Sequence, residues 1–331
     1  MPEDWREQLG TYDAILLGAL GDSGPADDPN RYRIPDSISL APLLQIRKGF
    51  DQWACERPAF NIPGAPQYLA DPRAAEIDLL VIRENSEGEY VGQGGRLAIG
   101  TPREIATQVE VFTRTASERI FRYAFERARE RAAERRSGIR RSREFTLAEG
   151  GTAEAQVCLI TKRNALMHWG EMYTEVFAEV AREYPDIAVH HELVDAACMK
   201  FVTQPWMFDV VVASNLQGDI LTDLAAVLCG GMGVAPSCNL NPSDRAQPSM
   251  FEPTHGSAPD LAGKGRADPR AMLLTAAMML DWLGVEDTAA AAAGRRLHAA
   301  VAADLAEHGG APRSTAEIGA AIVERLRAES A

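Results

Sequence analysis

The 331-residue sequence has few cysteines and no long apolar run. Its five cysteines are Cys55, Cys158, Cys198, Cys229 and Cys238. Their odd number and the lack of a CxxC pair argue against a disulfide framework or a zinc site. No window holds the roughly 18 unbroken apolar residues of a membrane helix, and the N-terminus has neither the basic end nor the apolar core of a signal peptide. The sequence therefore predicts a cytoplasmic protein with reduced, buried cysteines and no membrane partner.

Positive charge is also scarce, because 34 Lys and Arg residues stand against 47 Asp and Glu residues, for a formal net charge of −13. This balance argues against a nucleic-acid partner, which requires a basic face. One exception is the arginine-rich segment 127–143, in which Glu130 and Glu134 are interleaved. A nucleic-acid-binding arm is one interpretation. The alternation of charge favours the other, a solvated helix end that continues into a mobile loop.

Short apolar runs alternate with helical patterns along a chain long enough for two domains. The predicted strands, buried on both faces, are residues 13–20, 77–83, 157–161 and 208–214. The predicted helices are residues 117–131, 166–183 and 219–228. This alternation is typical of an α/β protein with much parallel sheet. Ser314 and Glu317 have the spacing of a capping box, which predicts a last helix close to the C-terminus.

Three arginines lie near predicted strand and helix ends. Arg47 and Arg57 follow a leucine-rich helical run, and Arg83 ends the predicted strand 77–83, shortly before Tyr90. α/β sheets bind ligands at the carboxyl ends of their strands, and a guanidinium binds a carboxylate through two parallel hydrogen bonds. Together the arginines indicate a substrate with more than one carboxylate, whereas each alone is as readily a surface ion pair.

Aspartates near a predicted helix start form the next candidate group. Asp219 and Asp223 are four residues apart and therefore on one helix face, and Asp195 lies upstream. Such carboxylates suit a hard divalent cation, Mg²⁺ or Mn²⁺, rather than zinc; helix capping by Asp219 is the alternative. Lys162 ends the strand 157–161, where a lysine near charged groups can act as acid or base, unless it is a surface lysine.

The usual nucleotide fingerprints, G-x-G-x-x-G and G-x-x-x-x-G-K-[ST], are absent. The candidate cofactor segment is residues 251–269, FEPTHGSAPDLAGKGRADP. Its small residues allow the backbone to approach a phosphate closely. Asp260 suits the two hydroxyls of a ribose and would repel a 2′-phosphate. A plain surface loop is the alternative.

These segments, in this order and spacing, resemble the β-decarboxylating dehydrogenases, the isocitrate and isopropylmalate dehydrogenase family. The strongest matches are VVVASNLQGDILTDLAAVL, FEPTHGSAPDLAGKG and VIRENSEGEY. The run IPDSISLAPLLQIRKGFDQW and the turn ENSEGEY look most like the tartrate/D-malate dehydrogenase branch. Leu40 stands where the isopropylmalate branch has a glutamate, seven residues before the first arginine. Leu40, Leu43 and Leu44 line up with the specificity helix and fit either a small substrate or an apolar branch.

The resemblance implies an isopropylmalate dehydrogenase-like, two-domain α/β fold with parallel or mixed central sheets. Residues 1–52 and 230–331 would form a discontinuous cofactor-side domain, and residues 53–229 the substrate, metal and dimerisation domain. Family members begin with a strand and a G-D-G-I-G turn, whereas the first strand here matches a later one. We therefore expect at least one N-terminal βα unit, of about 30 residues or more, to be missing.

The resemblance also implies roles for individual residues. Arg47, Arg57 and Arg83 match the substrate-carboxylate clamps, Tyr90 matches the tyrosine that protonates the enolate, and Lys162 matches the lysine that takes the hydroxyl proton. The metal ligands would be Asp195, Asp219 and Asp223. The implied contacts to NAD are Asn164, Glu252, His255, Gly256, Ser257, Ala258, Asp260 and Asp268. In relatives the lysine, the asparagine and the first aspartate come from the neighbouring subunit, which implies a homodimer with shared active sites.

The implied function is NAD- and divalent-metal-dependent oxidation, with or without β-decarboxylation, of a 2-hydroxy dicarboxylate such as D-malate or tartrate. The alternatives are a 3-isopropylmalate dehydrogenase and a truncated, catalytically impaired dimerising or regulatory homologue. Asp268 stands where NAD-using relatives usually have an asparagine that contacts the adenine. An ionised aspartate cannot donate a hydrogen bond, so we expect weakened NAD affinity that Asp268→Asn restores.

Overall fold

The computed structural model of the protein describes residues 1–21, 41–309 and 311–328. The chain folds into two compact units, which we call unit 1 (Met1–Leu79 with Thr222–Ala331) and unit 2 (Leu80–Leu221). Unit 1 thus contains both chain ends. Its boundaries differ from the predicted 1–52 and 230–331, since residues 54–60 pair with a strand of unit 1. The assignment of cofactor and substrate roles to two domains stays a prediction. Leu40 lies outside the described residues.

Four parallel strands form the centre of unit 2 and run in the order β3 (Asp78–Glu84), β10 (Val210–Ala213), β8 (Gln156–Thr161) and β9 (Ala188–Leu193). The predicted strands 77–83, 157–161 and 208–214 correspond to β3, β8 and β10 within a few residues. Each is almost wholly buried, as expected for parallel strands covered on both faces.

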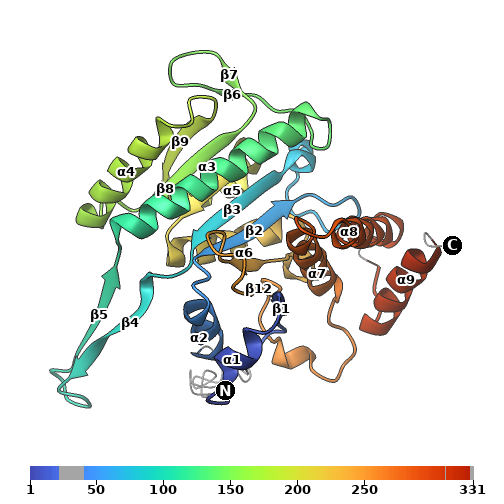
Figure 1. Ribbon diagram of the computed structural model, residues 1–331, viewed down its shortest axis with the longest axis horizontal. Helices are drawn as coiled ribbons and strands as arrows, with labels where there is room; N and C mark the ends of the chain where they lie inside the picture. The colour runs from blue at the N-terminus through green and yellow to red at the C-terminus, as the bar shows by residue number, and fades with distance from the viewer. Residues whose placement is uncertain (22–40, 310, 329–331) are drawn as a thin grey trace. The chain divides into compact units, whose positions relative to one another are not determined.

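Three helices cover these strands (Figure 1). Helices α3 (Arg114–Arg136) and α4 (Met167–Ala181) lie on one face, and α5 (Val194–Thr203) lies on the other. The predicted helices 117–131 and 166–183 are confirmed, and α3 extends beyond the prediction at both ends. Aromatic pairs such as Phe121–Tyr173, with ring centroids 4.5 Å apart, fix α3 against α4.

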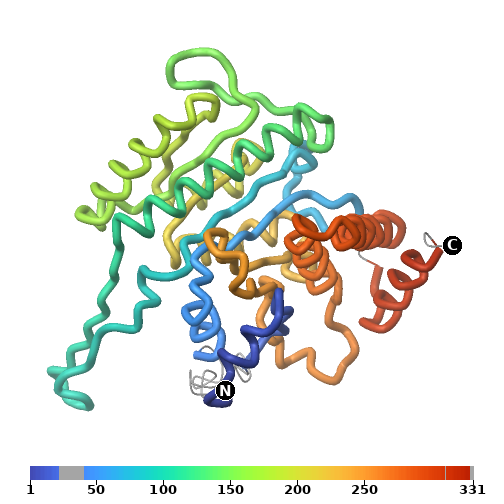
Figure 2. The backbone as a smooth tube through the Cα atoms, viewed as in Figure 1, coloured from blue at the N-terminus to red at the C-terminus, as the bar shows by residue number. Residues whose placement is uncertain are grey.

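A long antiparallel hairpin, β4 (Gly88–Leu97) with β5 (Ile105–Val111), extends from the strands of unit 2 (Figure 2). Most of its side chains are exposed, including Leu97, Ile99 and Ile105. The sequence did not predict the hairpin, because strands exposed on both faces lack the apolar alternation that marks a half-buried strand. A second, short hairpin joins β6 (Phe145–Thr146) to β7 (Thr152–Ala153).

The arginine-rich segment 127–143 ends α3 and continues into a loop, as predicted, but it is solvated on one side only. Arg131 and Arg135 are 4% and 5% exposed, and both bind Asp209, which is 0% exposed. The Nε of Arg131 donates to Asp209 Oδ1 at 2.6 Å, and Arg135 donates two hydrogen bonds to the same carboxylate at 2.7 and 2.8 Å. Arg143 donates to the backbone carbonyls of Phe208 and Trp206. These arginines therefore hold α3 and the following loop to the start of β10.

In unit 1 the strands run in the order β1 (Ala14–Leu16), β12 (Ser249–Phe251), β11 (Cys238–Leu240) and β2 (Ala54–Phe60). β1 is parallel to β12, whereas β11 is antiparallel to both of its neighbours. β1 is shorter than the predicted strand 13–20, and only Ile15 in it is buried. The prediction of burial on both faces fails here because β1 pairs only with β12 among the described strands.

Helices make up the rest of unit 1. They are α1 (Trp5–Leu9), α2 (Ala41–Gly49), α7 (Arg270–Leu283), α8 (Thr288–His308) and α9 (Thr315–Ala328). The boundary between the units falls within α6 (Asn215–Leu228), which begins four residues before the predicted helix 219–228. Short 3₁₀ helices are η1 (Pro72–Glu76), η2 (Pro205–Met207), η3 (Met232–Val234) and η4 (Pro259–Leu261). The capping box is confirmed, since Ser314 N donates to Glu317 Oε2 at 2.7 Å and Glu317 N donates to Ser314 Oγ at 3.2 Å.

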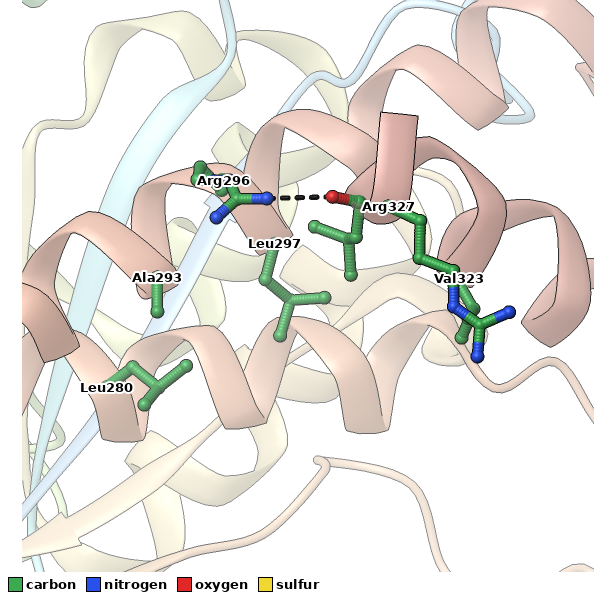
Figure 3. Close-up of a pocket in the computed structure, with 7 residues that line it drawn as sticks. Leu280, Ala293, Arg296, Leu297, Val323 and Arg327 are labelled. Carbon is green, nitrogen blue, oxygen red and sulfur yellow. Dashed lines mark hydrogen bonds between the residues drawn. The ribbon is translucent and has the colours of Figure 1, made fainter. Parts of the chain in front are cut away.

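A groove of about 520 Å³ lies between α7, α8 and α9 (Figure 3). Its lining residues are Leu280, Ala293, Arg296, Leu297, Val323, Leu326 and Arg327. Arg296 reaches across it and donates to the backbone oxygen of Leu326 at 2.7 Å. These lining residues include no carboxylate, thiol or imidazole, so the groove offers no group for acid–base or nucleophilic chemistry.

Four of the five cysteines are buried, as predicted, whereas Cys198 is partly exposed; all five are free.

Among the described residues, no helix combines the length and the apolar character that crossing a membrane requires.

The buried carboxylate of Asp209 generates a stability prediction. We expect Asp209→Asn to lower the free energy of unfolding by about 3–5 kcal/mol, because two buried guanidiniums then lose the charge of the carboxylate they share. Burial alone would raise the pKa of Asp209, but Arg131, Arg135 and Arg143 lower it to about 2. This folded-state pKa lies below the unfolded value of ~3.9. The stabilisation is therefore complete above pH ~4 and is lost as the pH falls towards ~2.

Urea denaturation at several pH values measures this effect. The matched control is Asp186→Asn, since Asp186 pairs with Arg129 at the surface and exposed pairs contribute about 0–1 kcal/mol. Equal losses in the two variants at pH 7 would contradict a special role for Asp209.

Candidate active site

Arg83 lies at the end of β3 and is held by the first turns of α6. It is 2% exposed, and its Nε and Nη2 donate to Asn215 Oδ1 at 2.9 and 2.7 Å. Its Nη1 donates to Asp219 Oδ1. The hydroxyl of Tyr90, on β4, donates to Asp219 Oδ2 at 3.1 Å, and the Arg83 guanidinium lies 5.3 Å from the centre of the Tyr90 ring. The structure thus brings together three of the predicted residues, Arg83, Tyr90 and Asp219, which we call the Arg83 cluster.

A glycine lets α6 approach Arg83 closely. A Cβ at Gly218 would lie 2.8 Å from Arg83 Cβ and 2.9 Å from its Cγ, which is closer than side chains pack. The Arg83 cluster therefore depends on the glycine as well as on its polar members.

Lys162 and Asp195 form a second predicted pair in unit 2. Lys162 follows β8, Asp195 lies in the first turn of α5, and Lys162 Nζ is 2.9 Å from Asp195 Oδ2. The hydrogen bond from Lys162 lowers the pKa of the Asp195 carboxyl. Both side chains are accessible, at 29% and 62% exposed. Asn164 is exposed in the turn after Lys162.

Arg57 in unit 1 is paired with the second half of α6. It is 8% exposed, its Nη1 donates to Thr222 Oγ1 at 2.7 Å, and the same nitrogen lies 3.7 Å from Asp223 Oδ1. Asp223 itself is 61% exposed. Asp219 and Asp223 are one helical turn apart, as predicted, and each faces a buried arginine.

Arg47, on α2, is paired with a residue predicted for the cofactor. It is 6% exposed, and its Nη2 donates to Glu252 Oε1 at 2.8 Å. Asn239 Nδ2 donates to the same oxygen at 2.9 Å. Glu252 thus provides a countercharge for Arg47, a contact that sequence spacing did not indicate.

Two further acids lie close to the Arg83 cluster. Glu84 is 4% exposed and accepts hydrogen bonds from the backbone nitrogens of Ser86 and Glu87 at 3.0 Å. Glu87 accepts from Thr113 N at 2.7 Å. Burial raises the pKa of both glutamates above its ordinary value, so either holds a proton more readily than a surface glutamate does.

The predicted cofactor segment, residues 251–269, connects β12 to α7. His255 Nδ1 lies 2.8 Å from Gly256 O, and Gly256, Ser257, Ala258 and Asp260 are exposed. Ala258 has a φ of +44° and begins η4, which contains Asp260. The segment therefore exposes backbone and an acidic side chain, which is the property that the sequence predicted for it.

Asp268 is already engaged within unit 1. Its Oδ1 accepts from the backbone nitrogen of Arg270 at 2.9 Å, and its Oδ2 accepts from Arg270 Nη1 at 2.8 Å. Both oxygens of the predicted adenine contact are thus hydrogen-bonded to one arginine.

The three predicted metal ligands do not converge in the structure. Within residues 1–21, 41–309 and 311–328, no group of three or more His, Cys, Asp or Glu side chains could hold a metal ion. Asp195 pairs with Lys162, Asp219 with Arg83, and Asp223 with Arg57. The donor chemistry of Asp219 and Asp223 nevertheless suits Mg²⁺ or Mn²⁺, because both offer accessible carboxylate oxygens on adjacent turns of α6.

Sequence reasoning missed the residues that orient the arginines, chiefly Asn215, Thr222 and Asn239. Asn215 is the first residue of α6, directly after a buried strand, and polar groups at a strand–helix junction of an α/β sheet are candidates for ligand sites. Thr222 and Asn239 carry no comparable signal in the sequence.

Comparison with known proteins identifies similar sequences and structures. A family model described as isocitrate/isopropylmalate dehydrogenase matches residues 1–323. The 3-isopropylmalate dehydrogenase of Beutenbergia cavernae is 44% identical over 319 residues, covering 96% of this chain and 81% of that protein. The enzyme of the same name from Thermobifida fusca is 43% identical over 329 residues, covering 98% and 83%. The crystal structure of isocitrate dehydrogenase from Methylococcus capsulatus superimposes with a TM-score of 0.78 at 32% identity, covering 99% of this chain and 85% of that one.

The contact between Gly218 and Arg83 generates a second prediction. We expect Gly218→Ala to lower the free energy of unfolding by about 1–3 kcal/mol, because the new methyl group overpacks against Arg83. The matched control is Gly319→Ala in α9, where a Cβ meets nothing within 4 Å and alanine should stabilise by about 0.4–1 kcal/mol. Chemical denaturation checks both variants. Stabilisation by Gly218→Ala would show that the close approach of α6 to Arg83 is not a constraint.

Proposed function

The chain belongs to the isocitrate/isopropylmalate dehydrogenase family, and on this premise we propose that it oxidises and decarboxylates 3-isopropylmalate with NAD and a divalent cation. The isopropylmalate dehydrogenases of this family use NAD and Mg²⁺ or Mn²⁺. Relatives that are 43–44% identical to this chain are named 3-isopropylmalate dehydrogenase. This similarity supports 3-isopropylmalate as the substrate of this chain over D-malate and tartrate. The similarity to the tartrate branch predicted from the sequence is therefore not confirmed. The observation that carries the proposal is the Arg83 cluster, which joins a carboxylate-binding group, a proton donor and a carboxylate ligand.

The arginines account for recognition of a dicarboxylate. The buried Arg83 and Arg57 present planar guanidiniums in fixed orientations, which suits two-point binding of carboxylates. Leu44 precedes Arg47 by three residues on α2 and therefore lies on the same helix face. It is partly buried and offers an apolar surface for the isopropyl branch. Leu43 instead packs against the core residues Ile15, Ile46, Phe50 and Met250.

Asp219 and Asp223 would hold the divalent cation, with Asp195 as the third ligand. When bound, the cation would lower the pKa of the substrate hydroxyl, and NAD⁺ would accept the hydride. Lys162 would take the hydroxyl proton as the neutral amine, and its contact with Asp195 places its Nζ beside a proposed cation ligand. Tyr90 returns a proton to the carbon that loses CO₂, and its hydrogen bond to Asp219 orients its hydroxyl.

The exposed segment 251–269 would bind the adenosine half of NAD. Asp260 accepts hydrogen bonds from the ribose hydroxyls and repels the 2′-phosphate of NADP. Asn164, exposed after β8, would contact the nicotinamide.

We further propose a homodimer with shared active sites. In unit 2, large apolar side chains are exposed on α5 and at the start of α6, where Met199, Val202 and Ile220 are 65%, 47% and 55% exposed. The hairpin β4–β5 exposes Leu97 and Ile105 as well. Exposed apolar groups gathered on neighbouring elements are typical of protein interfaces.

A substrate panel tests the proposed reaction. At saturating Mn²⁺ we expect NADH formation with 3-isopropylmalate at a higher kcat/KM than with D-malate or tartrate. Tyr90→Phe should lower kcat by about 10²–10⁴-fold with little change in KM, because the variant keeps the ring but loses the proton donor. No NADH formation with any of the three substrates would contradict the proposal and favour a catalytically impaired homologue.

Mixing two inactive variants tests the shared site. If Lys162 and Tyr90 of one site come from different subunits, random heterodimers of Lys162→Ala and Tyr90→Phe contain one intact site and restore about a quarter of wild-type activity. The matched control mixes Tyr90→Phe with Arg83→Gln, which act on the same side of the site and should restore none. Lack of recovery in the first mixture, with heterodimers confirmed by mass spectrometry, would contradict shared sites.

A further inference from the structure

The predicted adenosine-binding segment has little packing of its own. Residues 262–267 are all exposed, and Gly263 and Gly265 have positive φ values of +72° and +62°. A Cβ at either glycine would meet nothing within 4 Å. Turn hydrogen bonds from Ala262 N to Pro259 O and from Lys264 N to Leu261 O lie within the segment. Groups that reach it from elsewhere in unit 1 therefore add to what fixes its conformation.

The first residue of α9 reaches the stretch directly. Thr315 N donates to Gly265 O at 2.9 Å, and Thr315 Oγ1 donates to Ala267 O at 2.5 Å. Two backbone carbonyls of the segment are thus fixed by one threonine.

A buried ion network holds both flanks of this contact. Asp304, on α8, is 0% exposed, and its Oδ2 accepts from Arg270 Nε and Nη2 at 3.1 and 2.6 Å and from Arg313 Nη2 at 2.5 Å. Arg270 also binds Asp268, the last polar residue of the segment. Asp304 therefore links Arg270, which binds Asp268 at the end of the segment, to Arg313, which lies two residues before Thr315.

The network contains two aspartates and two arginines, and His308 Nδ1 lies 3.5 Å from Asp304 Oδ1. Burial alone would raise the pKa of Asp304, but the hydrogen bonds from Arg313 and Arg270 lower it, so the carboxylate is ionised. Asp268 supplies the second negative charge. Its replacement by asparagine would leave Arg270 and Arg313 with a single countercharge.

We propose that Asp268, Asp304 and Thr315 are positioning residues for the adenosine half of the cofactor, and that Asp268 acts through Arg270 rather than on the adenine. This inference rests on the assignment of residues 251–269 to adenosine under the proposed function. It reverses the expectation drawn from the sequence alone, because Asp268→Asn should weaken cofactor binding instead of restoring it.

Calorimetric titration with ADP-ribose, which lacks the nicotinamide, tests the proposal in the full-length protein. We expect Asp268→Asn and Thr315→Val each to raise the dissociation constant of ADP-ribose by about three- to tenfold, the size of one or two lost hydrogen bonds. The KM for NAD should rise in the same variants by a similar factor, which a loss of stability alone would not produce. Asp304→Asn should have the same effect if it folds, and the other two variants carry the test if it does not.

A purely structural variant provides the control. Asp287 caps α8 by accepting from Ala289 N at 2.9 Å, away from the segment. Asp287→Ala should lower the melting temperature without changing the affinity for ADP-ribose. The proposal is overturned if Asp268→Asn and Thr315→Val also lower the melting temperature without changing the affinity for ADP-ribose. It is overturned as well if Asp268→Asn binds ADP-ribose more tightly. If the wild-type protein binds no ADP-ribose, the assignment of the segment fails, and the inference fails with it.

Discussion

Pairing of buried arginines is the constraint on which unit 2 depends. A guanidinium removed from water requires a countercharge and hydrogen-bond acceptors, and both requirements are met at the two ends of one short strand. Asp209, just before β10, binds Arg131 and Arg135. Asn215, just after β10, binds Arg83. The central strand is thereby fixed to α3 at one end and to β3 at the other, and its carboxyl end becomes the place where the catalytic candidates meet.

The same constraint organises unit 1. Glu252 is the partner of Arg47, Asp223 lies opposite Arg57, and Asp304 binds two arginines at once. In each case the arginine comes from one element and the acid from another, so the ion pair also holds the elements together. An acidic chain with a formal net charge of −13 can therefore contain strongly cationic side chains at its candidate site without a basic surface.

The sequence predicted features that depend on local spacing, and it failed where distant segments meet. The parallel strands and the capping box follow from apolar runs and from an i, i+3 pair, both of which are readable in a few consecutive residues. The partners of the arginines cannot be read from neighbouring residues, since Arg83 and Asn215 are 132 residues apart and Arg135 and Asp209 are 74 apart. Alternating charges in residues 127–143 looked like a solvated face because spacing cannot show that a buried carboxylate faces Arg131 and Arg135. The roles taken from the family resemblance, including those of Asn164 and Asp260, stay predictions.

Each of the two arginines, Arg57 and Arg83, lies beside an aspartate of α6, and this bears on how a substrate could bind. Arg57 and Arg83 carry two positive charges, and Asp223 and Asp219 carry two negative ones. Under the proposed function, a dicarboxylate and a divalent cation together add no net charge. Under that function the guanidiniums would bind the substrate carboxylates, and the aspartates would bind the cation. Because charges that are already desolvated change partners, little new desolvation is required. A dicarboxylate arriving alone would add two uncompensated negative charges beside Asp219 and Asp223. The pairs therefore favour joint binding of substrate and cation over binding of either one by itself.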